Sequence, residues 1–325
     1  MPRIAIDAMG GDNAPAEVIE GAILAAEDGH SPFLVGDAGV IDAFLEGRDV
    51  DLPVVHASEV IDFHDDPSHA IREKRDASIT VAARMVRDGD ADAMVSAGST
   101  GAAMAAATFI VGRLPGVARP AIASIYPSGQ VVMDVGANLE CRPEHLLQFA
   151  VMGAALSTVY VGVAEPKVGL LNIGEEPSKG RDLERGAFAL LDASRTVAFI
   201  GNVEGRDLAT RSADVIVTDG FTGNVLLKTS EGAGRAIQQM ILETLAEPRY
   251  QDLVAGLLPA FAELRERLSS ESIGGAHLVG TRGVVVIAHG SSSRIAIRNA
   301  IRIAAEGVEH GLVERIGAGI DAAVS

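Results

Sequence analysis

The chain has 325 residues, of which 48% are hydrophobic, and it carries a formal net charge of −17 at pH 7. This charge argues against nucleic acid as the main partner, because neutralising phosphates requires a basic surface. The single cysteine rules out a disulfide framework, and the chain shows neither a signal-peptide pattern nor an apolar run long enough to span a membrane, so we expect a cytoplasmic protein.

Short apolar, β-branched runs alternate with helical patterns along the chain. Continuous apolar strands that alternate with helices are typical of parallel βαβ units whose sheet is covered on both faces. The sequence therefore predicts one α/β domain over residues 1–325, with layers of helices. The expected strands lie within 3–11, 32–37, 91–101, 131–138, 167–174, 196–202, 214–224 and 283–293, and the clearest helices within 16–28, 77–89 and 144–160.

Seven polar, glycine-rich loops follow these expected strands. Open parallel sheets bind ligands beyond the carboxyl ends of their strands, so seven such loops on one side of a sheet predict a shared active cleft. Each loop alone is also compatible with an ordinary turn. The loops contain Asp7 with Gly10, Gly11 and Asp12; residues 96–101; Asp134 with Asn138; residues 174–180; Asn202 with Glu204; residues 219–224; and residues 289–293.

Residues 250–268 follow a different pattern. Leucine and phenylalanine recur at helical spacing, interrupted by Gly256 and Pro259. We expect a helical excursion from the main domain at about 235–272. Two interpretations stay open: helices that pack on the core or on a second subunit, and an apolar tip that contacts the surface of a bilayer.

Two nucleotide-binding motifs are imitated but incomplete. Residues 223–230, GNVLLKTS, lack the glycine that a P-loop needs directly before its lysine, because position 227 is Leu. Residues 317–322, GAGIDA, are followed by too few residues for the βαβ unit of a dinucleotide fingerprint. The sequence therefore gives poor support to a dehydrogenase or a kinase.

Two further clusters allow a catalytic and a structural interpretation. His64, Asp65, Asp66 and His69 have side chains that bind metals, but the stretch also fits a polar loop that breaks at a proline. Cys141 lies four residues before a histidine, as a thiolate nucleophile would require, but it also fits a small structural cysteine at a helix start. We favour the structural interpretation of both, and no metal is expected.

The positive signals point to an anion. Serine-rich helix starts at 289–293 and 98–109 would present N–H groups and the positive end of a helix dipole, although serine is also a common helix cap. Lys179 and Lys228 each lie close to a strand-end loop and are candidates for neutralising phosphate, or are surface lysines.

Three arginines four residues apart share one helix face: Arg294, Arg298 and Arg302. On so acidic a protein this stripe fits a docking site for an acidic partner. It equally fits a solvated face paired with Glu306.

Taken together, the strand-end loops resemble those of a known family. Over essentially its full length the chain resembles the bacterial acyl-carrier-protein:phosphate acyltransferases of phospholipid synthesis. The stretches that carry the resemblance are IAIDAMGGDNAP (4–15), ADAMVSAGSTGA (91–102), DVGAN (134–138), NIGEEPSKG (172–180), GNVEGRD (201–207), VTDGFTGNVLLKTSEG (217–232), GGAHLVG (274–280) and AHGSSS (288–293).

The resemblance implies a three-layer α/β fold with a mainly parallel sheet, similar to isopropylmalate dehydrogenases and phosphotransacetylases. It implies a homodimer without metal or other cofactor. The implied reaction converts a long-chain acyl-carrier-protein thioester and inorganic phosphate into acyl phosphate and free carrier protein. The product would feed a membrane glycerol-3-phosphate acyltransferase on the way to phosphatidic acid, so peripheral association with the inner face of the membrane is expected.

The resemblance also implies roles for individual residues. Lys179 would hold phosphate or the developing charge, with Glu175 or Glu176 orienting it, and Asn224 would donate a hydrogen bond to phosphate or to the oxyanion. The other implied substrate-binding residues are Asp7, Gly10, Gly11, Asp134, Asn138, Asn202, Asp219, Gly223, Lys228, His289, Ser291 and Ser292.

The chain departs from the family pattern at two positions. The family usually has Asn where this chain has Ser99, which puts an amide donor there in doubt, and Ser where this chain has Ala77. Two other functions stay open: a phosphotransacetylase-like transfer from acyl-coenzyme A, and a non-catalytic fatty-acyl-binding protein.

Overall fold

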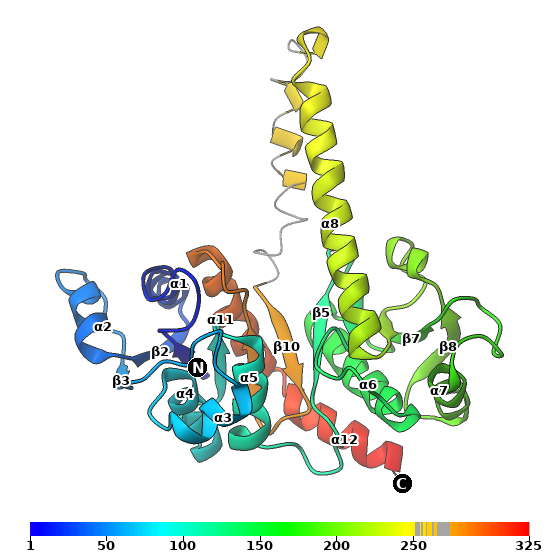
Figure 1. Ribbon diagram of the computed structural model, residues 1–325, viewed down its shortest axis with the longest axis horizontal. Coiled ribbons are helices and arrows are strands. Elements are labelled where there is room, and N and C mark those ends of the chain that lie inside the picture. The colour runs from blue at the N-terminus through cyan, green and yellow to red at the C-terminus, as the bar shows by residue number, and fades with distance from the viewer. Residues whose placement is uncertain (251–253, 255, 258, 262, 265–273, 325) are drawn as a thin grey trace.

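A computed structural model describes residues 1–250, 254, 256, 257, 259–261, 263, 264 and 274–324. Within these residues one eleven-stranded sheet has the order β3-β2-β1-β4-β11-β10-β5-β6-β9-β7-β8. Helices cover both faces of the sheet, as Figure 1 shows, so the three-layer α/β architecture is confirmed. The strands are β1 (Arg3–Asp7), β2 (Ser31–Gly36), β3 (Val54–His56), β4 (Ala93–Ser96), β5 (Ala121–Ile125), β6 (Val131–Met133), β7 (Lys167–Leu171), β8 (Ala198–Val203), β9 (Val215–Val217), β10 (Ala276–Val279) and β11 (Val284–Ile287).

The sheet consists of two parallel halves that run in opposite directions. Strands β3, β2, β1, β4 and β11 are parallel, as are β6, β9, β7 and β8. Between the halves, β10 is antiparallel to β11 and β5, and β5 is antiparallel to β6. The sheet is therefore mainly parallel, as expected, but the seven polar loops do not all leave it on one side. That part of the prediction was wrong, because β5 and β10 were not foreseen.

Each face of the sheet packs on its own set of helices. One face, running through both halves, packs on α3 (Pro67–Glu73), α4 (Ser78–Asp88), α5 (Thr100–Ala106) and the start of α8 (Gly220–Leu245). The opposite face packs on α1 (Ala16–Glu27) and α11 (Arg294–Glu309) in the first half, and on α6 (Pro143–Leu156), α7 (Asp182–Ala193) and α12 (Leu312–Val324) in the second. The remaining helical segments are α2 (Ala38–Leu45), the π-helical turns Ala107–Val111 and Ser157–Val161, and the 3₁₀ turns Gly205–Ala209 and Pro248–Tyr250.

Local sequence rules account for many helix ends. Five helices begin behind a side chain that accepts a hydrogen bond from the N–H three residues later, which satisfies one of the free donors of the first turn. Helix α4 ends at Gly89, whose φ of +81° is readily adopted only by glycine. The capping side chains are Asp37, Asp66, Ser99, Asp219 and Ser293.

Helix α8 projects from the body of the molecule, as Figure 1 shows. It begins at Gly220, earlier than the helical excursion expected from about residue 235. Its far end exposes large apolar side chains, among them Ile237, Met240 and Leu242. Most of 251–273 lies outside the described residues, and the two interpretations of 250–268 therefore stay predictions. In the described part of the chain no helix is long and apolar enough to cross a membrane.

Candidate functional site

A buried carboxylate organises the loop that follows β6. The oxygens of Asp134 accept hydrogen bonds from the N–H groups of Ile122, Gly136, Ala137 and Asn138, at 2.7 to 3.2 Å. The side-chain amide of Asn138 adds a fifth at 2.8 Å. Burial raises the pKa of the Asp134 carboxyl, and the N–H donors oppose that rise. With both oxygens occupied in this way, Asp134 shapes the loop 134–138.

The same loop is fastened to the first turn of α8. The carbonyl oxygen of Asn138 accepts a hydrogen bond from Gly220 N–H at 2.8 Å. A Cβ at Gly220 would lie 2.7 Å from that oxygen, and one at Gly223 would collide with the carbonyl oxygen of Asp134. Only glycine allows so close an approach. The contact places Asn224 against Gly136, because the Asn224 side chain is the nearest group to a Cβ built there.

An arginine that the sequence analysis missed joins α8 to the loop of Lys179. The guanidinium of Arg181 donates hydrogen bonds to Glu184 in α7 and to Asp219, the buried cap of α8. The hydrogen bond to Glu184 is the largest cause of a raised pKa for Arg181, and the hydrogen bond to Asp219 is the second largest. The sequence signal was weak, since Arg181 stands 38 residues from Asp219 and only folding brings them together.

Lys179 lies in a loop that two asparagines hold in place. Asn172 donates its side-chain amide to the carbonyl oxygen of Lys179 at 3.2 Å, and Asn202 donates to that of Glu176 at 2.9 Å. The Lys179 ammonium is 3.8 Å from a Glu176 oxygen, and its side chain is 45% exposed. Glu175 instead pairs with Arg206 at 3.6 Å. Of the two candidate carboxylates, Glu176 is therefore the one placed to orient Lys179.

Lys228 lies one helical turn beyond Asn224 on α8. Its ammonium is exposed and 3.1 Å from Glu231. Asn202 has a different feature: its side-chain oxygen is buried, and no described residue gives it a hydrogen bond. The second half of the sheet thus gathers seven of the predicted residues at adjoining loops: Asp134, Asn138, Lys179, Asn202, Asp219, Gly223 and Asn224.

The first half of the sheet gathers a second group. Asp7, at the end of β1, accepts hydrogen bonds from the hydroxyls of Ser78 at 2.5 Å and Ser96 at 2.6 Å, and burial raises its pKa. A Cβ at Gly10 would collide with the Asp7 carboxylate. This group lies at the ends of β1, β4 and β11, and in the described part of the chain no hydrogen bond or ion pair connects it to the group around Asn224.

Three predicted residues after β11 belong to this first-half group. The carbonyl oxygen of Gly290 accepts a hydrogen bond from Asp12 N–H at 2.7 Å, which joins the loops of β1 and β11. His289 and Ser291 are exposed, Ser292 is half-buried, and Ser293 caps α11. Gly11, with a φ of +122°, belongs to the loop after β1 and lies against Ala97 and Gly290.

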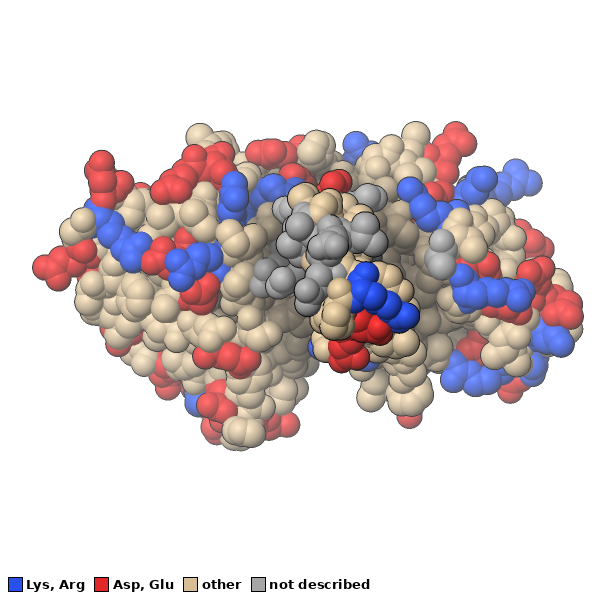
Figure 2. Space-filling view, turned by 90° about the horizontal axis from the view of Figure 1, so that it is seen from above, with Lys and Arg blue, Asp and Glu red and all other residues tan. Residues whose placement is uncertain are grey.

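The arginine stripe on α11 is paired with carboxylates. Arg294 contacts Glu17 and Arg298 contacts Asp28, both at α1, whereas Arg302 contacts Glu306 on its own helix at 2.6 Å. Figure 2 shows lysine and arginine side chains interspersed with carboxylates over the visible face of the molecule. Docking of an acidic partner on this stripe stays a prediction, and it would have to compete with these ion pairs.

Local contacts favour the structural interpretation of both the 64–69 cluster and Cys141. Asp65 pairs with Lys74 at 2.6 Å, and Asp66 caps α3. Burial raises the pKa of Cys141 to about 11, so its thiol stays protonated at neutral pH. The ring of His145 accepts a hydrogen bond from Arg142 N–H, which leaves it poorly placed to activate a nucleophile.

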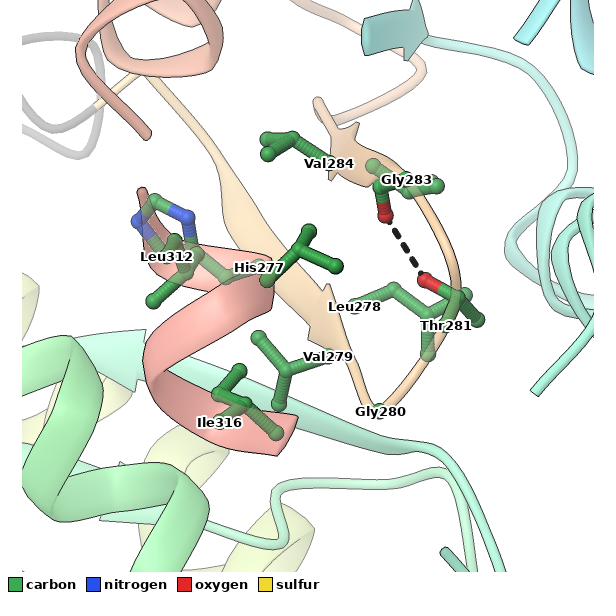
Figure 3. Close-up of a pocket in the computed structure, with 11 residues that line it drawn as sticks. His277, Leu278, Val279, Gly280, Thr281, Gly283, Val284, Leu312 and Ile316 are labelled. Atoms are coloured by element: carbon green, nitrogen blue, oxygen red, sulfur yellow. Dashed lines mark hydrogen bonds between the residues drawn. The ribbon is translucent and has the colours of Figure 1, made fainter. Parts of the chain in front are cut away.

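A small internal cavity of about 10 Å³ lies away from both loop groups, between β10 and α12 (Figure 3). Its volume suits about one water molecule. His277 of β10 borders it, fully buried, and no described residue forms a hydrogen bond with either ring nitrogen. Burial lowers the pKa of His277 to about 4. The ring of Tyr160 lies 4.3 Å away, centroid to centroid.

Comparison with known sequences gives matches over nearly the whole chain. The family model described as fatty acid synthesis protein matches residues 2–315. A phosphate acyltransferase of Heliobacterium modesticaldum is 49% identical over 323 residues, covering 97% of this chain and 96% of that protein. One of Gloeothece citriformis is 47% identical over 325 residues, covering 97% and 93%.

Solved structures match the fold. A phosphotransacetylase from Streptococcus pyogenes superposes with a TM-score of 0.63 at 18% identity, covering 95% of this chain and 94% of that one. A branched-chain phosphotransacylase from Enterococcus faecalis gives a TM-score of 0.58 at 16% identity, covering 95% and 100%. The expected likeness to the phosphotransacetylase fold is thereby confirmed.

Proposed function

This chain belongs to the family described as fatty acid synthesis protein, and from that membership we propose that it is a phosphate acyltransferase acting in phospholipid synthesis. A phosphate oxygen attacks the carbonyl carbon of an acyl thioester, and a tetrahedral oxyanion forms. The carbon–sulfur bond then breaks, the thiolate leaves and takes up a proton, and acyl phosphate remains. Phosphate is already anionic at neutral pH, so no general base is needed.

The observation that carries this proposal is the convergence of three loops at the start of α8. Asp134 holds the loop 134–138, Asn138 fastens that loop to Gly220, and Arg181 joins the cap of α8 to the segment that follows Lys179. An ammonium and an amide are thus held on structured supports. Positioning and charge stabilisation of this kind are what an attack by a strongly solvated anion requires.

We assign the chemistry to Lys179 and Asn224. The Lys179 ammonium exchanges its long 3.8 Å contact with Glu176 for the phosphate. Asn224, in the first turns of α8, donates a hydrogen bond to the phosphate or to the oxyanion, near the positive end of the helix dipole. Asp134, Asn138, Asn202 and Asp219 hold the loops and the helix start that carry these two residues.

We further propose acyl carrier protein as the donor of the acyl group and a homodimer as the working unit. The acyl phosphate would pass to a membrane glycerol-3-phosphate acyltransferase. The apolar side chains exposed at the far end of α8, such as Met240, support a contact of that end with either a second subunit or the inner face of the membrane.

The test is to incubate the purified protein with palmitoyl-acyl carrier protein and phosphate, and to trap acyl phosphate with hydroxylamine. Lys179→Ala and Asn224→Ala should each lower the rate by about 10²–10³. Arg195→Ala is a matched control, because Arg195 is exposed and lies in the turn before β8. Near-wild-type rates in folded Lys179 and Asn224 variants would refute the assignment.

The same assay separates the two other functions. A phosphotransacetylase-like enzyme would use palmitoyl-coenzyme A at least as well as the carrier-protein thioester. A non-catalytic fatty-acyl-binding protein would retain lipid and form no acyl hydroxamate from either donor.

A further inference from the structure

A cavity of about 420 Å³ lies between the end of α5, with the turn that continues it, and the segment 118–120 that leads into β5. Figure 1 shows α5 and β5 on either side of β10. Its volume falls in the range of small-molecule binding sites. Its lining combines an apolar wall, which includes Met104, Phe109 and Pro120, with the cations Arg113 and Arg119.

The apolar wall exposes an aromatic side chain to solvent. Phe109 is 60% exposed, and the guanidinium of Arg72 lies 5.8 Å from the centre of its ring. Phe109 belongs to the π-helical turn Ala107–Val111 that continues α5. Such turns are rare and are frequent at functional sites. An exposed phenylalanine on a π turn beside a cavity indicates a surface that contacts a ligand.

The two cations of the lining are free to bind an anion. Arg113 donates a hydrogen bond to the carbonyl oxygen of Ala118. Neither Arg113 nor Arg119 forms an ion pair with any carboxylate of the described residues, although the protein has a net charge of −17. Guanidinium groups in this situation suit a phosphate, which they can bind through two hydrogen bonds.

The cavity shares a wall with the proposed catalytic site. Asn138 lines the cavity, and its carbonyl oxygen accepts the hydrogen bond from Gly220 at the start of α8. Asn224 lies in the second turn of that helix, against Gly136 of the same loop. The cavity and the helix that carries Asn224 are therefore joined through Asn138.

We propose that this cavity binds the phosphopantetheine arm of the acyl donor, with its phosphate at Arg113 and Arg119 and its apolar part against Met104 and Phe109. The inference rests on the proposed function. A bare acyl chain has no charged group to bind the two guanidinium groups. The phosphopantetheine arm has a phosphate for the arginines and an apolar part for the apolar wall. Acyl carrier protein and coenzyme A both carry the arm, so the assignment holds for either donor.

The test measures binding of 4′-phosphopantetheine and of pantetheine, which lacks the phosphate, to the full-length protein by calorimetry. We expect the phosphorylated compound to bind about tenfold more tightly, because a hydrogen bond between charged groups is lost without the phosphate. Arg119→Gln should weaken that preference, and Arg119→Lys should keep most of it. The double variant Arg113→Gln/Arg119→Gln should bind the two compounds equally. Arg195→Gln, the exposed control, should leave the preference at the wild-type value.

The apolar wall has its own prediction. Phe109→Ala should weaken binding of both compounds by the same factor and leave their ratio unchanged. In turnover, the double variant Arg113→Gln/Arg119→Gln should raise the KM for palmitoyl-phosphopantetheine about tenfold with little change in kcat, and should leave the KM for palmitoyl-pantetheine unchanged.

Equal affinity of the wild-type protein for the two compounds, or an unchanged preference in Arg119→Gln, would overturn the inference. The binding measurement does not depend on turnover. Loss of the preference in the double variant without any acyl phosphate formation by the wild-type protein would support the cavity assignment and refute the proposed function. Acyl phosphate formation by a wild-type protein that binds both compounds equally would support the proposed function and refute the cavity assignment.

Discussion

Buried His277 should make the protein lose stability in mild acid. The side chain lies on β10 in the middle of the sheet, and its ring nitrogens have no hydrogen-bond partner among the described residues. Burial lowers its pKa from 6.5 to about 4. Between these pH values the unfolded chain binds a proton at this position and the folded chain does not. The free energy of unfolding therefore falls as the pH falls from 6.5 to about 4.

The size of the effect follows from the shift. At about 1.4 kcal/mol per pKa unit, the full difference is roughly 3 kcal/mol. At pH 4.5 most of it has developed, so the loss relative to pH 7.5 is roughly 2.5 kcal/mol. For a protein of ordinary stability this is a large share of the total.

The assay is urea unfolding at pH 7.5 and 4.5 for the wild type and for His277→Leu, which cannot titrate. Other groups titrate over the same interval, but their contribution cancels in the difference between the two proteins. We expect the stability of the wild type relative to the variant to fall by roughly 2.5 kcal/mol between pH 7.5 and 4.5.

Leu278→Val, a neighbouring core substitution without an ionisable group, is the matched control and should shift stability equally at both pH values. If wild type and His277→Leu lose stability in parallel, the neutral buried histidine is not the source of acid sensitivity and the reasoning fails.

Three further predictions concern the proposed site. Arg181→Ala should lower the rate of acyl phosphate formation roughly 10- to 100-fold, because it releases the cap of α8 from the Lys179 loop; Arg195→Ala, at an exposed position before β8, should not. Gly223→Ala should abolish most activity, because a Cβ collides with the Asp134 carbonyl and displaces Asn224, whereas Gly232→Ala on the same helix meets nothing within 4 Å and should retain activity. Arg298→Glu should weaken binding of acyl carrier protein more at low than at high ionic strength, and an equal change at both would refute docking on the α11 stripe.

Much of the architecture was predictable from local pattern. Helices expected at 16–28, 77–89 and 144–160 are observed at Ala16–Glu27, Ser78–Asp88 and Pro143–Leu156, because apolar periodicity and capping residues mark them. The strands β5 and β10 were missed. Their sequences, AIASI and AHLV, are short and carry few β-branched residues. Strand direction also depends on pairing between distant segments, so the reversal of the sheet could not be deduced.

The candidate site was predictable only in part. Lys179 and Asn224 were chosen through motifs at strand ends, and their catalytic roles remain predictions. Arg181 could not be found in this way, because its hydrogen bond to Asp219 joins two residues that are distant in the sequence. The cavity at Phe109 could not be predicted either, because folding alone brings Asn138 to the segments 104–113 and 118–120 that line it.

The tight contact between Gly223 and the Asp134 carbonyl fixes the point about which α8 would tilt. The helix has 26 residues, so at 1.5 Å per residue it is about 39 Å long. Asn224 lies about 1.5 Å along the axis from this point, whereas Leu242 lies about 28 Å from it. If α8 tilts as a rigid rod, a swing of about 3 Å at Leu242 moves Asn224 by only about 0.2 Å. A tilt of the far end of α8 would therefore leave Asn224 almost unmoved beside the loop 134–138.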